Sequence, residues 1–179
     1  IFDNSCLVEL DEEPPHEINK EALLVALAVS KKMDMYMINQ INVMRKTVID
    51  GSNTSGFQRT AIVGMNGKIN TSKGKVGITT LSIEEESASI IGDKDESKFG
   101  LDRLGIPLLE ITTEPDIVDG EHARETAEKI GMLLRMTGKA LRGIGTIRQD
   151  VNVSIEGGAR VEIKGVQELD DIPLIIEKE

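Results

Sequence analysis

Cysteine and aromatic residues are scarce in this chain of 179 residues. Its single cysteine, Cys6, excludes an internal disulfide and any metal site built from several cysteines. A lone cysteine also suits a reducing compartment, so we expect a cytoplasmic protein. There is one Tyr, there are three Phe and there is no Trp, which leaves few rings on which a single-strand binder could stack bases.

Basic charge and long apolar runs are also lacking. Lys and Arg total 21 against 31 Asp and Glu, which gives a formal net charge of −10. A compact acidic domain repels phosphate backbones unless its cations are segregated, so nonspecific nucleic-acid binding is disfavoured. No apolar run approaches the ~20 residues that span a bilayer. At 39% hydrophobic and 29% charged residues, the composition predicts one soluble globular domain.

The pattern of the chain favours an α+β fold with a mainly antiparallel sheet and helices packed on one face. We expect helices over 19–33 and 119–138, because Asn19 and Asp119 are suitable N-caps and apolar residues recur every three to four positions. Strands are expected over residues 5–10, in TVID (47–50) and FQRTAIVG (57–64), within 67–83, over 106–113 and in the final third.

The final third, TIRQDVNVSIEGGARVEIKGV (146–166), alternates apolar and polar residues and predicts an antiparallel ribbon. One side would be apolar. A three-residue loop at 157–159 would set Ile155 opposite Val161 and Val153 opposite Ile163. The other side carries Arg148, Asp150, Asn152, Glu162 and Lys164. That side is either a solvated sheet face or the lining of an active site in which cations hold phosphates.

Three consecutive glutamates, 84–86, interrupt the strand LSIEEESASI (81–90). Alternation places Glu85 on the apolar face and Glu84 on the other. Glu110, in IPLLEI (106–111), has no evident solvent side. A buried carboxylate needs a cationic partner. Glu85 and Glu110 could therefore share Mg²⁺ between neighbouring strands; alternatively, Glu85 bends into solvent and Glu110 pairs with Arg103 or another cation.

Four stretches resemble a known family: RKTVIDGSNTSGFQRTAIVG (45–64), KVGITTLSIEEESASI (75–90), LDRLGIPLLEITTEPDI (101–117) and RGIGTIRQDVNVSIEGGARVEIKGVQEL (142–169). They are similar to the E-type component of archaeal glutamyl-tRNA(Gln) amidotransferases and, more distantly, to the B-type component of the bacterial enzymes. The likeness extends along essentially the whole chain.

The resemblance implies a cradle-like catalytic domain related to glutamine synthetase and guanidino kinases, using ATP and Mg²⁺. ATP would phosphorylate the γ-carboxylate of glutamate mischarged on tRNA(Gln). Ammonia from a partner glutaminase (asparaginase-like) subunit would then displace the phosphate to give Gln-tRNA(Gln). We therefore expect a cytoplasmic heteromeric assembly that handles the acceptor end of the tRNA.

The resemblance also implies roles for particular residues. The family's metal-binding acids match Glu85 and Glu110, in agreement with the burial argument. Contacts with the cofactor or the acceptor end are expected from Arg45, Lys46 and Arg59, which flank the loop DGSNTSG (50–56), and from Asn152 and Glu162. Catalytic roles are expected for Arg148, Asp150 and Lys164.

We expect residues 1–179 to form a single partial catalytic domain. The family's opening strand, with a Glu-Ile-His motif that supplies further metal ligands, would precede Ile1, and its tRNA-binding domains would follow Glu179. On this expectation the chain by itself does not amidate. Two other functions stay open: a tRNA-independent carboxylate–amine ligase or phosphagen-type kinase on the same fold, and a noncatalytic scaffold that docks the glutaminase.

Overall fold

The computed structural model describes residues 16–49, 53, 56–91, 98–143 and 145–179. Its elements are α1 (Lys20–Lys32), β1 (Tyr36–Met37), β2 (Met44–Thr47), β3 (Phe57–Thr71), β4 (Gly74–Glu85), β5 (Ser89–Ile91), β6 (Lys98–Gly100), β7 (Pro107–Thr113), α2 (Gly120–Met136), β8 (Gln149–Val153), β9 (Val161–Val166) and α3 (Asp171–Lys178). The strand expected at residues 5–10 lies outside the described residues. None of the helices in these ranges is long and apolar enough to cross a membrane.

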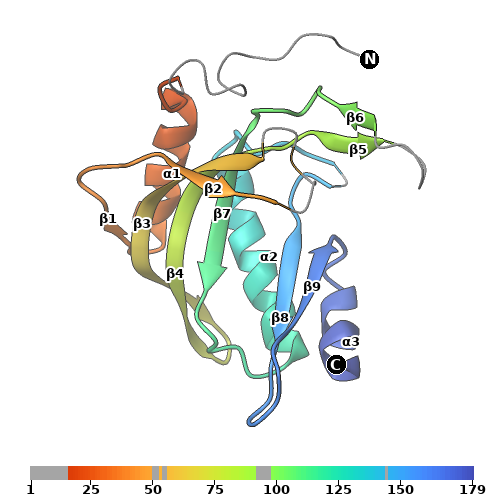
Figure 1. The fold of residues 1–179 in the computed structure, drawn as a ribbon. Coiled ribbons are helices and arrows are strands. Elements are labelled where there is room, and N and C mark those ends of the chain that lie inside the picture. Colours follow the sequence, from red (N-terminus) through yellow and green to blue (C-terminus); the bar gives the residue numbers. More distant parts are fainter. Residues whose placement is uncertain (1–15, 50–52, 54–55, 92–97, 144) are drawn as a thin grey trace.

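A five-stranded antiparallel sheet forms the centre of the fold (Figure 1). Its strands lie in the order β1-β3-β4-β7, and β2 also pairs with β3. The segment GKINT (67–71) continues β3 instead of starting a new strand, so β3 and β4 form one long hairpin. Two smaller pairs, β5–β6 and β8–β9, complete the strands.

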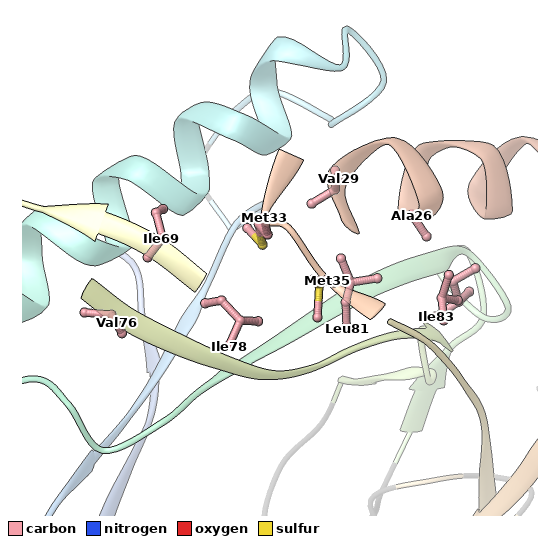
Figure 2. Packing of buried hydrophobic residues seen from close by; sticks show 10 residues of the cluster. Ala26, Val29, Met33, Met35, Ile69, Val76, Ile78, Leu81 and Ile83 are labelled. Carbon is pink, nitrogen blue, oxygen red and sulfur yellow. The ribbon is translucent and has the colours of Figure 1, made fainter. Parts of the chain in front are cut away.

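Helices α1 and α2 lie on the same face of this sheet (Figure 1). Figure 2 shows Ala26, Val29 and Met33 of α1 directed toward β4, where Leu81 and Ile83 point back at them. Leu133 and Leu134 of α2 pack against the same core cluster. The expected α+β architecture with helices on one face of an antiparallel sheet is therefore confirmed.

Both expected helix N-caps are confirmed. The Asn19 side chain accepts a hydrogen bond from the backbone N–H of Ala22 at 2.9 Å, and Asp119 accepts one from His122 N–H at 2.8 Å. Each bond satisfies a backbone donor that the first turn of a helix leaves unpaired. Helix α2 ends at Met136, and Gly138 follows with φ of +70°, the left-handed conformation that favours glycine.

Sequence reasoning missed the third helix, α3. Its residues DIPLIIEK begin on acidic side chains, and Pro173 occupies the first turn, where proline is tolerated. Ile172 is 1% exposed and belongs to a second core cluster with Ala123 of α2 and Val166 of β9. Helix α3 therefore holds the β8–β9 ribbon against α2.

The register expected for the β8–β9 ribbon is wrong by two residues. Val153 pairs with Val161 and Val151 pairs with Ile163, whereas the prediction paired Ile155 with Val161. The strand ends at Val153, a longer loop follows, and Ile155 is 74% exposed. The expected apolar and polar sides are kept, because a shift of two residues does not exchange the faces of a strand.

The tip of the β3–β4 hairpin is fastened to α2 by polar contacts. Glu125 accepts hydrogen bonds from the backbone N–H of Ser72 at 2.8 Å and from the Ser72 hydroxyl at 2.5 Å. Lys129 lies 2.8 Å from Glu125 Oε1 and also donates to the Asn70 carbonyl. Hydrogen bonds from Lys129 and then from Ser72 lower the pKa of Glu125 to about 2.

We predict that Glu125→Gln lowers the stability of the chain in a pH-dependent way. A carboxyl whose pKa is depressed by folding stabilises the fold above its ordinary pKa of about 4.5 and loses that contribution as the pH falls toward about 2. The difference in unfolding midpoint between wild type and variant should be largest above pH 5 and vanish near pH 2. Urea denaturation across this range measures it, with Glu128→Gln on the same helix as the control. A difference that does not change with pH contradicts the assignment.

Candidate active site

The three glutamates at 84–86 point to alternate sides of the sheet. Glu84 pairs with Thr60 of β3, and Ile83 pairs with the buried Ala61. Glu85 therefore shares the face of Ile83, which packs under α1, as the alternation predicted. Glu84 and Glu86 lie on the opposite face, called here the open face, which is turned away from α1 and α2 (Figure 1).

Glu85 is held in an ion pair with Arg59. Arg59 Nε donates to Glu85 Oε2 at 2.8 Å, and Arg59 Nη2 donates to Oε1. The third nitrogen, Nη1, donates to the His16 carbonyl at 2.8 Å. Both oxygens of Glu85 are thus occupied by one guanidinium that is only 15% exposed. The alternative in which Glu85 bends into solvent is wrong.

Glu110 does not face Glu85. It pairs directly with Ser82 of β4, and Glu85 pairs with Pro107, so the register places the two glutamates on opposite faces of neighbouring strands. The expected juxtaposition of Glu85 and Glu110 around one cation is therefore corrected. The carboxylate that shares the open face with Glu110 is Glu84.

Lys46 completes this group on the open face. Its Nζ lies 3.2 Å from Glu84 Oε1, and the Glu84 residue is 7% exposed. The Ser82 hydroxyl donates to Glu110 Oε2 at 3.4 Å. Strands β2, β4 and β7 thus each contribute one charged side chain to the same patch.

The electrostatics of the patch are strained by two carboxylates. Partial burial raises the pKa of Glu110, and the neighbouring Glu84 carboxylate raises that pKa further, while Lys46 opposes the shift. Two carboxylates this close repel each other when both are ionised. A further cation between them would relieve that repulsion.

Glu86 lies at the end of the patch and binds two arginines. Arg103 Nη2 is 2.8 Å from Glu86 Oε2, and Arg148 Nη2 is 3.3 Å from the same oxygen. Arg103 precedes β7, and Arg148 stands directly before β8. The alternative partner that the sequence suggested for Glu110, Arg103, therefore pairs with Glu86.

The other residues that the sequence singled out do not all converge. Arg45 pairs with Arg59 across β2 and β3, so both lie on the face opposite to Lys46, and Arg45 stacks over the Phe57 ring with its guanidinium carbon 4.8 Å from the ring centroid. The expected grouping of Arg45, Lys46 and Arg59 as one phosphate site is corrected accordingly.

On the ribbon, the expected catalytic and cofactor residues mostly contact one another. Asp150 Oδ1 accepts a hydrogen bond from the Gly165 backbone N–H at 2.8 Å, where Gly165 has φ of +73°. Lys164 Nζ lies 3.7 Å from Glu162 Oε2, and Asn152 pairs with Glu162 across the strands. Arg148 is the ribbon residue that the structure joins to β4.

Sequence reasoning missed Glu84 and Glu86 as members of the patch. Alternation had already separated both from Glu85, and that signal pointed to a common face. The register between β4 and β7 was the part that the sequence did not supply, because IPLLEI is apolar on both faces.

We predict opposite stability effects for two substitutions in this region. Glu85→Gln leaves the guanidinium of Arg59 short of a charged acceptor and should lower the free energy of unfolding by about 1–3 kcal/mol. Glu110→Gln should leave stability unchanged or raise it at pH 7, because a carboxyl whose pKa is raised by folding destabilises the fold once the pH exceeds its ordinary value. Chemical denaturation of the two variants decides; a larger loss for Glu110→Gln contradicts the assignment of faces.

Comparison with known proteins places this geometry in a family. Residues 4–179 match the model of the GatB/GatE catalytic domain. The chain is 60% identical over 179 residues to the glutamyl-tRNA(Gln) amidotransferase E-type component of Methanosarcina acetivorans, covering 99% of this chain and 28% of that protein. It is 56% identical over 179 residues to the protein of the same name from Haloarcula marismortui, covering 99% and 29%. The corresponding protein of Methanococcus maripaludis is 59% identical over 178 residues, covering 99% and 28%.

The chain thus spans between a quarter and a third of the length of these relatives. The family match, however, extends over almost every residue of the chain. This chain belongs to the GatB/GatE catalytic domain family.

Proposed function

We propose that this chain carries the phosphorylation site of an archaeal glutamyl-tRNA(Gln) amidotransferase. The enzyme would convert Glu-tRNA(Gln) to Gln-tRNA(Gln) with ATP, Mg²⁺ and ammonia. The observation that carries the proposal is the group of Lys46, Glu84 and Glu110 on the open face, in a chain 56–60% identical to relatives named for that activity. A sheet covered by helices on one face leaves its other face for substrates.

The proposal includes the wider setting of the enzyme. The antiparallel sheet would act as a cradle of the glutamine synthetase and guanidino kinase type, in a cytoplasmic heteromer. A glutaminase (asparaginase-like) partner would supply ammonia, and further parts of the complete protein would hold the body of the tRNA. Such a division of labour accommodates a catalytic chain with net charge −10, because only the acceptor end must approach it.

The first step joins two anions. One oxygen of the glutamyl γ-carboxylate attacks the γ-phosphorus of ATP, the bond between that phosphorus and the β,γ-bridging oxygen breaks, and ADP leaves with the electron pair. Repulsion between carboxylate and triphosphate is the main obstacle, so catalysis consists largely of positioning and charge stabilisation. Lys46, held by Glu84, is placed to bind a phosphate oxygen at the edge of the patch.

The second step consumes the acyl phosphate. The lone pair of ammonia attacks the γ-carbonyl carbon, the bond from that carbon to the phosphate oxygen breaks, and the nitrogen loses a proton to water. Water would otherwise hydrolyse the intermediate, so the site must be covered while ammonia arrives. In this step the cations of the patch stabilise the departing phosphate.

The patch fits a hard divalent ion in its donor chemistry. Mg²⁺ prefers oxygen ligands and commonly uses one or two protein carboxylates, with phosphate oxygens and water completing its shell. Among the described residues there is no group of three or more His, Cys, Asp or Glu side chains that could hold a metal, so Glu84 and Glu110 would hold the ion as a pair. The ion would neutralise phosphate charge there. In this proposal Glu84 takes the role that the resemblance implied for Glu85.

We predict that Glu84→Gln and Glu110→Gln each reduce phosphorylation of Glu-tRNA(Gln) by at least a hundredfold in the complete protein. Each removes half of the carboxylate pair without changing its shape. The assay follows transfer of labelled γ-phosphate from ATP in the presence of Glu-tRNA(Gln), with free glutamate as the substrate control. Glu162→Gln on the ribbon is the matched control and should keep most of the activity. Unchanged phosphorylation in both patch variants contradicts the proposal and favours a scaffold role.

A further inference from the structure

The contacts of Glu86 leave an excess of positive charge at one end of the patch. Its Oε2 atom accepts from both Arg103 and Arg148, at 2.8 and 3.3 Å. One carboxylate therefore faces two guanidinium groups, and the three side chains together carry a formal charge of +1. The Glu86 side chain is 13% exposed, whereas both arginines are more than 40% exposed.

This arrangement fixes the arginines while leaving them free to bind. A guanidinium has five N–H donors in a planar fork, and only one contact of each arginine to Glu86 is observed. The remaining donors of two arginines held on one carboxylate oxygen can converge on one oxyanion. Guanidinium forks bind carboxylate and phosphate oxygens in pairs, which a single ammonium cannot do.

The position of the pair connects it to the carboxylate patch. Glu86 follows Glu84 by two residues on the same side of β4. Its backbone N–H also donates to the Ile106 carbonyl at 2.8 Å, and its carbonyl accepts from Gly105 N–H at 2.8 Å, so the end of β4 is tied to the segment that enters β7. Arg148 enters from the start of β8, far along the sequence.

We propose that Arg103 and Arg148, positioned by Glu86, form an oxyanion-binding site at the end of the open face. The proposal rests on the proposed function and adds a binding pair to it. Two oxyanions of the reaction share the required chemistry: the phosphate transferred from ATP and the γ-carboxylate of the glutamyl group. Glu86 acts as a positioning residue, since it contacts the arginines and would not contact the ligand.

The test uses arginine-to-lysine variants of the complete protein with its glutaminase partner. Arg103→Lys and Arg148→Lys keep the charge and the pairing with Glu86 but remove the fork. Arg160→Lys, an exposed arginine beside the β8–β9 loop, is the matched control. Thermal melts should agree among all four proteins, which excludes a merely structural effect.

Two readouts separate the sources of the oxyanion. Steady-state kinetics gives KM separately for ATP and for Glu-tRNA(Gln), and we expect a rise of about tenfold or more in one of them for both arginine variants. A rise in KM for ATP assigns the site to phosphate, and a rise in KM for Glu-tRNA(Gln) assigns it to the glutamyl carboxylate. Both KM values within twofold of wild type, as for Arg160→Lys, overturn the site.

A direct binding measurement keeps this outcome distinct from failure of the proposed function. Titration of the wild-type protein with inorganic phosphate should show binding that both variants weaken by about tenfold or more. If the wild type binds phosphate in this way but does not phosphorylate Glu-tRNA(Gln), the oxyanion site stands and the proposed function fails. If the wild type phosphorylates Glu-tRNA(Gln) and the variants match it in kinetics and in phosphate affinity, only the oxyanion site fails.

Discussion

Successive side chains of a strand point to opposite faces of the sheet, and at residues 84–86 this alternation separates three adjacent glutamates. One face is covered by α1, where an unpaired carboxylate would be strongly destabilising. The fork of Arg59 satisfies Glu85 on that side through two nitrogens. Glu84 and Glu86 are thereby committed to the open face, and every other feature of the candidate site follows from that commitment.

The open face is balanced in charge although the chain as a whole is acidic. Glu84, Glu86 and Glu110 are accompanied by Lys46, Arg103 and Arg148, so three carboxylates meet three cations, while the chain carries a net charge of −10. The balance is uneven along the patch. Burial and the neighbouring Glu84 raise the pKa of Glu110, whereas the end near Glu86 has an excess of guanidinium. A cation is favoured at the first place and an oxyanion at the second, which suits a reaction between a metal-bound nucleotide and a carboxylate.

Local signals in the sequence predicted the parts of this fold that depend on neighbouring residues. Asn19 and Asp119 cap their helices as expected, and alternation placed Glu85 on the apolar face correctly. Register is a different kind of information, because it depends on where a strand ends and how long its loop is. The ribbon slipped by two residues for this reason, and Glu110 was matched with the wrong glutamate because both faces of its strand are apolar.

The central claim is that Glu84 and Glu110, and not Glu85, form the acidic pair of the site. Anomalous scattering from Mn²⁺ in crystals of the complete protein with a non-hydrolysable ATP analogue tests it most directly. The account predicts an anomalous peak beside the Glu84 and Glu110 carboxylates on the open face, with Glu85 still bound to Arg59. A peak coordinated by Glu85, with Arg59 displaced, would contradict it.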